Sequence, residues 1–381
     1  MRIGIDARFL THPQAGGFKT YTQNLVAALS QADQDNEYRL YVDREPSAPL
    51  SYGPNFQVRV VAGTLPLVDM VWREQVGLPR RASCDRLDLF HATSLTAPLR
   101  LPCPAVVTIH DMLWRRDLPS HPALNKHAIM DWYYRHVPER AARTAGAVVT
   151  VSQSARDSIV RGLGLPPERV HVTHEAAGPR FRPVADADAL ARVRLKYDLP
   201  GPFLLAMGSA DPRKNVAGLL RAYAALPPAR QELCPLAVVW ANPHLAPSLA
   251  DLAATLGVGA RLRFLQGVED ADLVLLYNAA TLFVFPSHHE GFGLPLLEAM
   301  ACGTPVVAAD NSSLPEIAGD AALLIDSHDD AALTAALARA LADPDLRADM
   351  AAKGRAQAAR FSWARCARDT VAVYREVACG R

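Results

Sequence analysis

Two glutamates beside a glycine-rich turn are the side chains best suited to chemistry in this sequence. Glu290 and Glu298 flank the run Gly291-Phe292-Gly293-Leu294-Pro295, which follows an apolar segment ending at Phe285. Glycine permits close backbone approach and Pro295 suits the first turn of a helix, so free N–H groups there could bind a diphosphate. The carboxylates could accept hydrogen bonds from the sugar and the ribose of the same ligand. The helix dipole alone also favours acids near a helix start, but the glycines and the preceding strand favour a ligand site.

The second candidate is a pair of adjacent cations. Arg213 and Lys214 follow the predicted strand Phe203–Met207 and Gly208, and they are predicted to open a helix. Arg can bind two phosphate oxygens at once, whereas Lys acts as a point charge. Cations at the start of a helix oppose its dipole, so a bound anion explains them better than a solvated basic turn does.

The N-terminal half offers weaker candidates. Gly16 and Gly17 lie between a predicted strand and helix, but their loop is not a GxGxxG fingerprint and indicates little alone. His110 ends a predicted strand, where a lone histidine is more often structural than functional. Further candidates in this half, which would face a second substrate that accepts the transferred sugar, are Lys19, Tyr21, His91, Thr93 and Asp111.

The stretch from Phe285 to Pro305 resembles the signature of the retaining GT-B glycosyltransferases of family 4. It is most similar to the bacterial mannosyl- and rhamnosyltransferase branch that builds surface polysaccharides. The resemblance implies that Glu290 contacts the donor sugar near the reacting carbon and that Glu298 binds the ribose. It also implies that Arg213 and Lys214 bind the phosphates, and that His110 lines the transferred sugar.

The resemblance covers nearly the whole chain. It extends from the Gly-Gly loop at Ala15–Tyr21, where the family often has Arg in place of Lys19, to Phe361-Ser362-Trp363 and a last helix that crosses back onto the first domain. His174-Glu175-Ala176 departs from the Asn-Gly or Asn-Ala turn of many relatives, so no role carries over there. The donor-binding residues implied are Gly16, Gly17, Gly208, Gly291, Phe292, Gly293, Leu294, Glu298 and Val268; Leu265 is expected to flank the base, and the amides of Asn311-Ser312-Ser313 to help hold phosphate.

The order of predicted elements indicates an α/β fold. Short β-branched segments alternate with longer amphipathic ones, and the alternation restarts after a Pro/Ala/Asp-rich linker at 179–202. We therefore expect two Rossmann-like, doubly wound parallel-sheet domains facing a cleft: residues 1–182 with 362–381 on the acceptor side, and 183–361 for the nucleotide sugar. The predicted strands are Arg2–Asp6, Tyr38–Val42, Val58–Val61, Leu87–His91, Ala105–His110 and Ala147–Val151, then Phe203–Met207, Leu236–Trp240, Leu262–Leu265, Leu282–Phe285, Pro305–Ala308 and Ala322–Ile325.

Composition favours a cytoplasmic protein with a mild charge asymmetry. The six cysteines are scattered, which indicates reduced thiols, and no apolar run approaches the length of a membrane span. Residues 1–185 carry 22 Lys and Arg against 17 Asp and Glu, whereas the rest carries 18 against 22. Nothing in this balance favours nucleic acid. The segment Lys126–Arg143, with Trp132, Tyr133, Tyr134, Arg135, Arg140 and Arg143, could lie on the inner face of the plasma membrane or be a half-buried helix with a solvated basic face.

No metal is expected. Asp-x-Asp occurs at Asp186/Asp188 in the linker, at Asp270/Asp272 at a predicted helix N-cap, and at Asp343/Asp345 in a surface turn. None of these follows a core strand, where a metal-dependent transferase would hold its cation. The adjacent side chains of His288 and His289 would diverge.

We expect a metal-independent hexosyltransferase that acts with retention. It would transfer mannose or rhamnose from a nucleotide diphosphate donor such as GDP-mannose to a glycan or polyprenyl-linked glycan, as in O-antigen synthesis. A nucleotide-sugar epimerase on the same fold is one alternative, disfavoured by the Glu290–Glu298 signature. A non-catalytic sugar-nucleotide-binding scaffold is the other, although a scaffold would be expected to lose its charged donor ligands.

Overall fold

The computed structural model describes residues 1–12, 16–63, 69–115, 128–241 and 247–380. The chain separates into two units, Met1–Glu175 with Ser362–Arg381, and Ala176–Phe361. Residues 176–182 were expected in the first domain but belong to the second unit. The reason is their packing, since the ring of Phe181 meets that of Tyr277 with centroids 5.9 Å apart.

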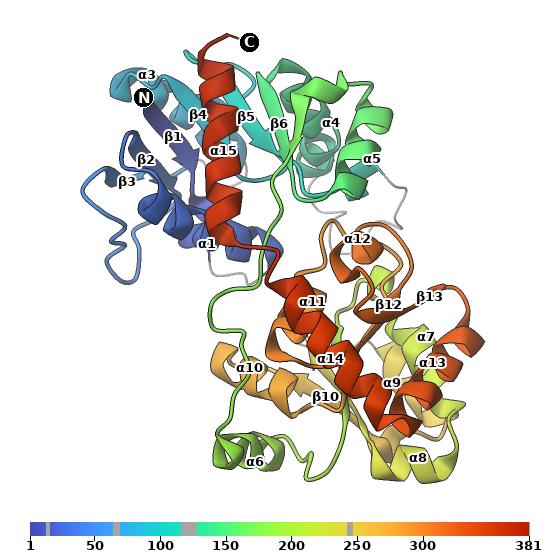
Figure 1. The fold of residues 1–381 in the computed structure, drawn as a ribbon. Coiled ribbons are helices and arrows are strands. Elements are labelled where there is room, and N and C mark those ends of the chain that lie inside the picture. The colour runs from blue at the N-terminus through green and yellow to red at the C-terminus, as the bar shows by residue number, and fades with distance from the viewer. Residues whose placement is uncertain (13–15, 64–68, 116–127, 242–246, 381) are drawn as a thin grey trace. The chain divides into compact units, whose positions relative to one another are not determined.

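The first unit is built on a seven-stranded parallel sheet (Figure 1). Its strand order is β3-β2-β1-β4-β5-β6-β7, and every pairing is parallel. From β1 the chain adds β2 and β3 on one side and then β4 to β7 on the other, so the switch point of the topology lies between β1 and β4. Ligands of such sheets bind beyond the carboxyl ends of the strands at this switch point. The strands are β1 (Arg2–Asp6), β2 (Glu37–Val42), β3 (Phe56–Val60), β4 (Leu89–Ala92), β5 (Ala105–Thr108), β6 (Ala147–Thr150) and β7 (Val170–Val172).

The second unit repeats this topology with six parallel strands. Its order is β10-β9-β8-β11-β12-β13, so the switch point lies between β8 and β11. Each of these two strands leads into one of the candidate ligand segments. The strands are β8 (Leu204–Gly208), β9 (Leu236–Trp240), β10 (Leu262–Gln266), β11 (Leu282–Phe285), β12 (Val306–Ala309) and β13 (Ala322–Ile325). The predicted doubly wound α/β class is confirmed.

Helices cover both sheets. In the first unit they are α1 (Gly17–Ala32), α2 (Asp69–Trp72), α3 (Leu78–Asp85), α4 (Ala128–Thr144), α5 (Gln153–Leu163) and α15 (Trp363–Ala378). In the second they are α6 (Ala187–Lys196), α7 (Val216–Ala224), α8 (Pro228–Leu233), α9 (Pro247–Thr255), α10 (Asp270–Ala279), α11 (Leu294–Cys302), α12 (Leu314–Ala318), α13 (Asp330–Ala342) and α14 (Pro344–Ala358). The last helix, α15, lies beside α1 on the sheet of the first unit (Figure 1).

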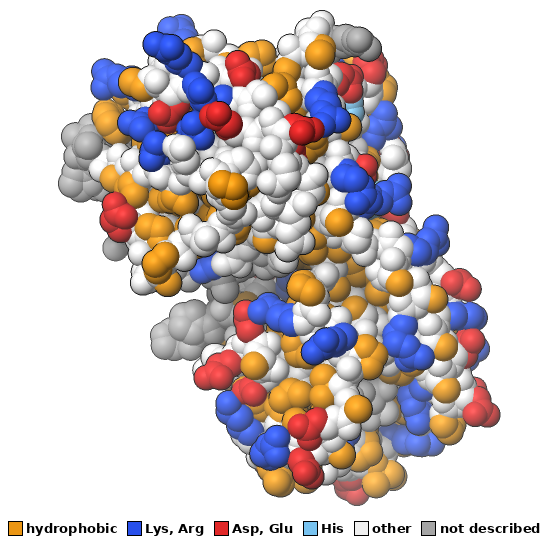
Figure 2. All heavy atoms as spheres, turned by 60° about the vertical axis from the view of Figure 1, so that its left-hand side comes forward, with side chains coloured by type: hydrophobic (Ala, Val, Ile, Leu, Met, Phe, Trp, Pro, Cys, Tyr) orange, Lys and Arg blue, Asp and Glu red, His pale blue; other side chains and the backbone are white. Residues whose placement is uncertain are grey.

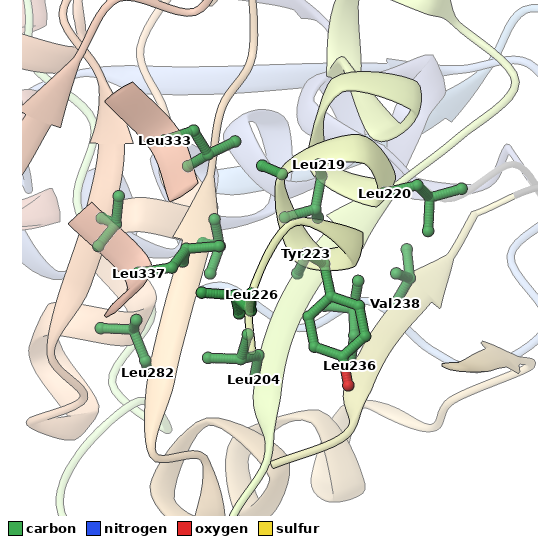
Figure 3. Packing of buried hydrophobic residues seen from close by; sticks show 14 of the residues in the cluster. Leu204, Leu219, Leu220, Tyr223, Leu226, Leu236, Val238, Leu282, Leu333 and Leu337 are labelled. Atoms are coloured by element: carbon green, nitrogen blue, oxygen red, sulfur yellow. The ribbon is translucent and has the colours of Figure 1, made fainter. Parts of the chain in front are cut away.

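Figure 3 shows how the second unit buries its apolar residues. Leucines of α7 and α13 point onto the face of the sheet formed by β8, β9 and β11. Strands covered in this way are apolar along their whole length rather than alternating, as Leu282–Phe285 is. This packing fixes the strand ends from which the candidate residues project.

Three local features differ from the predictions. Strand β7 (Val170–Val172) was not predicted, because it is short and carries a histidine in its centre. A π-helix at Arg73–Gly77 between α2 and α3 was not predicted either. Arg213 and Lys214 do not open α7; they lie in a 3₁₀ turn, Pro212–Lys214, that ends just before it.

Charge is well mixed on the surface. On the face shown in Figure 2, Lys and Arg side chains are interspersed with Asp and Glu. The mild charge difference between the two halves of the sequence therefore does not form a single basic patch on this face.

Candidate functional site

A compact ion cluster lies beyond the switch point of the second unit. One carboxylate oxygen of Glu290 is 2.8 Å from Nζ of Lys214, and the other is 3.0 Å from Nη1 of Arg213. Arg213 and Lys214 come from the turn after β8, and Glu290 from the loop after β11. The two predicted segments thus meet at neighbouring strand ends, as their place in the topology requires.

The local sequence fixes the turn that carries the cations. The side chain of Asp211 accepts a hydrogen bond from the backbone N–H of Arg213 at 2.9 Å. Asn215 has a left-handed backbone with φ of 52°, and its side chain caps α7 by accepting from the N–H of Gly218. Its amide also donates to the carbonyl of Ser327 at 2.8 Å. The turn is therefore anchored on both sides of the two cations.

The loop that carries Glu290 is held by three residues after β12. Ser312 Oγ accepts from the backbone N–H of Glu290 at 3.0 Å. Ser313 Oγ contacts the carbonyls of Glu290 and Phe292, at 3.0 and 2.8 Å, and Asn311 donates to the carbonyl of Ser287. These three side chains therefore hold the Glu290 loop in position. The sequence had predicted a different role for these residues, phosphate binding through their backbone amides.

Glu290 is held as a carboxylate. Burial would raise its pKa, but Lys214 and Arg213 more than offset burial and lower it below the usual value. Glu290 is 9% exposed, and the Arg213 and Lys214 side chains are each 18% exposed. Arg213 also pairs with Asp211 at 3.2 Å, so a ligand that reaches this cluster meets two cations and the carboxylates of Glu290 and Asp211.

The start of α11 adds backbone donors beside the cluster. Gly293 is the N-cap residue with φ of 105°, and it has no side chain to cap this end. A Cβ on Gly293 would lie 2.7 Å from Leu314, so only glycine fits both the backbone angle and the space. Pro295 lies in the first turn and Gly303 ends the helix in a left-handed conformation, as predicted. Uncapped N–H groups at a helix start attract anions.

Glu298 lies inside α11 and has a different partner. Its carboxylate accepts from the hydroxyl of Tyr277 on α10 at 3.3 Å, and the residue is 8% exposed. Burial, with Glu298 beside it, raises the pKa of Tyr277 well above its usual value, so the hydroxyl stays protonated. Glu298 is thus connected to α10 through Tyr277.

The remaining donor-side candidates lie around these strands. Gly208 ends β8, where a Cβ would approach Val238 to 2.7 Å. The ring of Phe292 is buried against Phe361. Gly291 and Leu294 flank the turn into α11, and Leu265 (buried) and Val268 (half-buried) lie at the end of β10 and just after it.

In the first unit, His110 is enclosed by aromatic rings and an acid. Its ring meets Phe18 and Tyr21 edge to face, with centroids 5.0 and 4.7 Å apart. Its Nδ1 is 3.3 Å from the carboxylate of Glu175, which is 3% exposed. The other ring nitrogen lies 3.4 Å from the carbonyl of Thr93. Both ring nitrogens therefore face oxygen acceptors, and Glu175 fixes the orientation of the imidazole.

Glu175 was missed as a functional candidate. The sequence showed only a departure from the turn found in many relatives. Its partner lies 65 positions away, after a different strand, so no local spacing could have revealed the pair. An acid close after the β-branched residues of 170–173 was the signal that the sequence offered.

Two acceptor-side candidates must be corrected. His91 is fully buried, with one ring nitrogen 2.6 Å from the Tyr374 hydroxyl of α15 and the other 2.7 Å from Thr108 Oγ1. Burial, with a smaller effect from His110, lowers the pKa of His91 to about 3, so it is neutral. Tyr21 is fully buried as well. Because α15 covers this part of the sheet, neither side chain is placed to touch an acceptor.

The other predicted residues of this half lie near the start of α1 or after β5. Gly16 and Gly17 begin α1, and Lys19 donates to the carbonyl of His12 at 3.0 Å. Asp111 is half-buried and accepts from the N–H of Leu113. Ala15, at the head of the predicted loop, lies outside the described residues.

The predicted Asp-x-Asp pairs have structural partners. Asp186 and Asp343 cap α6 and α14. Asp270 and Asp272 lie in the first turn of α10 rather than at its N-cap, and Asp272 binds Lys196 at 2.6 Å.

The ring of His288 stacks on that of His328 with centroids 4.4 Å apart, and burial lowers the pKa of His288. Within the described part of the chain, no group of three or more His, Cys, Asp or Glu residues is arranged to hold a metal ion.

Comparison with known proteins agrees with this architecture. The family model described as Glycosyltransferase Family 4 matches residues 15–176, and the one described as Glycosyl transferases group 1 matches residues 190–357. The O-antigen chain mannosyltransferase B of Escherichia coli is 36% identical over 288 residues, which cover 75% of this chain and 74% of that protein.

Solved structures share the fold over the whole chain. Sucrose-phosphate synthase from Thermosynechococcus elongatus superposes with a TM-score of 0.78 at 21% identity, covering 100% of both chains. Anabaena Alr3699/HepE, solved in complex with UDP-glucose, gives a TM-score of 0.74 at 18% identity, over 98% of this chain and 99% of that one. The chain thus belongs to the family 4 glycosyltransferases and has the two Rossmann-like units of the GT-B fold.

Proposed function

We propose that this glycosyltransferase transfers mannose or rhamnose from a nucleotide diphosphate donor, with retention, to a glycan or polyprenyl-linked glycan in surface polysaccharide synthesis. The observation that carries the proposal is the Arg213–Lys214–Glu290 cluster, because it joins two cations and a carboxylate at the switch point of the second unit. The epimerase alternative is not favoured, since the relatives are transferases.

The donor diphosphate is assigned to Arg213, Lys214 and the N–H groups at the start of α11. At an effective dielectric of about 20, one cation about 4 Å from a phosphate oxygen contributes roughly 4 kcal/mol. A helix terminus carries about half a charge and contributes perhaps half as much. Together these groups can stabilise a departing diphosphate, which is the task that a divalent cation performs in other transferases. We therefore propose metal-independent transfer.

Retention is proposed from the arrangement of the carboxylates. Both oxygens of Glu290 are engaged by cations, which leaves it suited to hold sugar hydroxyls rather than to attack carbon. The acceptor hydroxyl would attack from the side that the diphosphate leaves, through an oxocarbenium-like state, and pass its proton to a phosphate oxygen. The bond between the sugar carbon and the phosphate oxygen breaks as the new glycosidic bond forms.

The choice of sugar follows a relative that is 36% identical and matched over 74% of its length. The E. coli protein is named as an O-antigen mannosyltransferase, which makes GDP-mannose the first donor to test. Donor turnover should be screened with GDP-mannose, dTDP-rhamnose, UDP-glucose and UDP-GlcNAc, with and without added EDTA. NMR of the product then gives the anomeric configuration. Inversion of the anomeric centre, or turnover abolished by EDTA, would contradict the corresponding part of the proposal.

We propose a cytoplasmic location with peripheral contact at the membrane through α4. Among the described residues, no helix is long and apolar enough to cross a bilayer. Trp132 and Tyr134 of α4 are 51% and 39% exposed, and Arg135 and Arg140 are exposed as well, whereas Tyr133 is buried. Lys126, at the head of the predicted segment, lies outside the described residues. Exposed aromatic and basic side chains on one helix suit an anionic interface.

Charge reversal at Arg135 and Arg140 tests this contact. The double variant should float with anionic liposomes several-fold less than the wild type, because each basic residue near an anionic surface contributes about 1 kcal/mol. Reversal at Arg192 and Arg365, which are exposed elsewhere, is the matched control and should leave flotation unchanged. Equal flotation of all three proteins would exclude α4 as the contact.

Glu175 is proposed as a positioning residue that acts through His110. Glu175→Gln keeps the size of the side chain but removes the charge that faces Nδ1 of His110. We expect kcat to fall about tenfold to 100-fold, because a misplaced contact near the reacting centre is costly, while KM for the donor changes little. Steady-state kinetics separate the two constants.

A matched control for this variant is Glu139→Gln. Glu139 pairs with Arg143 at 3.0 Å on the surface of the same unit and is not part of either site. It should leave kcat unchanged. A loss in Glu175→Gln that appears only in the melting temperature, with kcat intact, would show that Glu175 has a purely structural role.

A further inference from the structure

Tyr277 is a fully buried residue of α10 whose hydroxyl donates to a predicted ligand carboxylate. Its hydroxyl oxygen lies 3.3 Å from Oε2 of Glu298, which is 8% exposed in α11. A buried tyrosine hydroxyl requires a hydrogen-bond partner, and backbone carbonyls satisfy that of Tyr223 in the same unit. Because the partner of Tyr277 is instead a carboxylate that the resemblance assigns to the ribose, this pair is a candidate for a role in recognition.

The ring of Tyr277 is fixed by its neighbours. It meets the rings of Phe181, in the segment before α6, and of Phe283, in β11, edge to face with centroids 5.9 and 5.3 Å apart. The hydroxyl of Thr304, which follows α11, donates to the backbone carbonyl of Tyr277 at 2.7 Å. Close packing on these sides leaves the hydroxyl one position beside α11.

The helix that carries Tyr277 is anchored as well. It packs against both α6 and α11. The side chain of Asn278 donates to the carbonyl of Arg182 at 3.1 Å and accepts from the N–H of Val184 at 2.8 Å. Arg180 pairs with Asp270 in the first turn of the same helix. The position of Tyr277 is therefore set before any ligand binds.

The partner of Glu298 differs in kind from those of Glu290. Lys214 and Arg213 share the charge of Glu290, whereas the hydroxyl of Tyr277 is neutral. Burial, and then the charge of Glu298, raises the pKa of Tyr277 well above its usual value, so the proton stays on the tyrosine. Tyr277 thus orients Glu298 without neutralising it. An oriented carboxylate accepts hydrogen bonds from hydroxyl groups and repels phosphate, which suits a ribose rather than the diphosphate.

We propose that Tyr277 is a positioning residue that sets the selectivity of the enzyme for the ribose hydroxyls of its donor nucleotide. It acts through Glu298, because its hydroxyl orients one carboxylate oxygen before the ribose arrives. A glutamate side chain has several rotatable bonds, and fixing them in advance removes an ordering cost that would otherwise weaken binding. This inference rests on the proposed function, since it deepens the nucleotide site of the same enzyme.

The ratio of two binding constants tests the proposal. The probes are GDP and UDP, each compared with its 2′,3′-dideoxy form, and each is titrated into the full chain by calorimetry at low temperature. The wild type should bind the ribose form about tenfold to 100-fold more tightly, since hydrogen bonds to a charged group have effects of this size. In Tyr277→Phe this ratio should fall about threefold to tenfold, because the ring remains but the orienting hydroxyl is lost.

The ratio separates positioning from packing. A general loss of packing would weaken the ribose and dideoxy forms equally, so the ratio would not change. Tyr223→Phe is the matched control, because Tyr223 is also fully buried in this unit and donates to the carbonyls of Gln231 and Cys234, each at 3.1 Å. Its ratio should equal that of the wild type. Glu298→Ala gives the lower limit, a ratio near one.

Thermal melting checks that each variant is folded at the temperature of the titration. If Tyr277→Phe is not, Glu298→Asp carries the test, because it draws the carboxylate away from the hydroxyl and should also lower the ratio. An unchanged ratio in the variant that carries the test, or a wild type that binds both forms equally, would overturn the inference. Binding of the diphosphates that depends on Lys214 would then still support the proposed donor site. If the wild type binds neither GDP nor UDP, that donor site fails, and the inference fails with it.

Discussion

Replacing Lys214 by Ala is expected to lower the turnover of the preferred donor by about 100- to 1000-fold. Removal of one preorganised group that stabilises developing charge typically has an effect of this size. Nζ of Lys214 lies 2.8 Å from Glu290 and is 5.1 Å from the ring centre of Phe285, so the cation is held at the end of β11. In the proposed reaction this cation would meet the charge that develops on the departing diphosphate. Steady-state turnover with saturating donor measures the effect.

Two further variants show whether charge is the cause. Lys214→Arg keeps a cation and should retain more turnover than Lys214→Ala. Lys353→Ala removes a lysine that pairs with Asp349 at 2.8 Å on the surface of the same unit, and turnover should not change. Near-wild-type turnover in Lys214→Ala would remove this residue from the leaving-group site.

Strand bounds and helix ends were predicted best, because they depend on the order of residues within one short segment. The strands Arg2–Asp6, Leu236–Trp240, Leu282–Phe285 and Ala322–Ile325 were predicted with their observed bounds. Each is a short apolar run bounded by polar or turn residues, which is the signal of a buried parallel strand. The start of α11 was predicted for a similar reason, because Gly293, Pro295 and Gly303 have positional meanings at helix ends.

The meeting of Arg213, Lys214 and Glu290 was also predictable, although the residues are 76 to 77 positions apart. Both segments follow strands of one parallel sheet, and the carboxyl ends of such strands lie at one edge. The sequence did not predict the form of the turn. Pro212 begins the 3₁₀ segment and Asn215, with a left-handed backbone, ends it before α7 begins; the Asn215 side chain also contacts the carbonyl of the distant Ser327.

Long-range pairings of single buried side chains could not be predicted. The bond of His91 to Tyr374 joins residues 283 positions apart, and it depends on where α15 lies. The hydrogen-bond network of the buried Glu74 draws residues from the 3₁₀ turn Arg8–Leu10 after β1, the π-helix, the loop after β4, and α4. No period or spacing in the sequence encodes such contacts, because they arise only once the elements are packed.

Replacing Glu290 by Gln is expected to produce two opposite effects. The side chain keeps its size but loses the charge that lies between Lys214 and Arg213. The cations then repel one another, and the unliganded protein should lose about 2 kcal/mol, as expected for a charged hydrogen-bonded pair with limited exposure. For a unit of this size the melting temperature should fall by about 4–8 °C. Turnover should fall by about 100-fold, because the carboxylate proposed to hold the donor sugar is lost.

Binding of the nucleoside diphosphate alone should instead become stronger. In the wild type the diphosphate is proposed to share both cations with Glu290, whereas in Glu290→Gln only Asp211, 3.2 Å from Arg213, still competes for them. We expect calorimetry with GDP or UDP to show about tenfold tighter binding, equivalent to about 1.4 kcal/mol. The diphosphate should also raise the melting temperature of the variant by more than that of the wild type.

Glu232→Gln provides the control for these measurements, since Glu232 pairs with Arg261 at 2.9 Å on the exposed surface of the same unit. It should change neither stability nor diphosphate affinity measurably, because exposed pairs contribute about 1 kcal/mol or less. If Glu290→Gln binds the nucleoside diphosphate no more tightly than the wild type, the carboxylate and the phosphates do not share these cations. Arg213 and Lys214 would then stabilise the Glu290 loop alone, and the diphosphate would have to bind elsewhere in the unit.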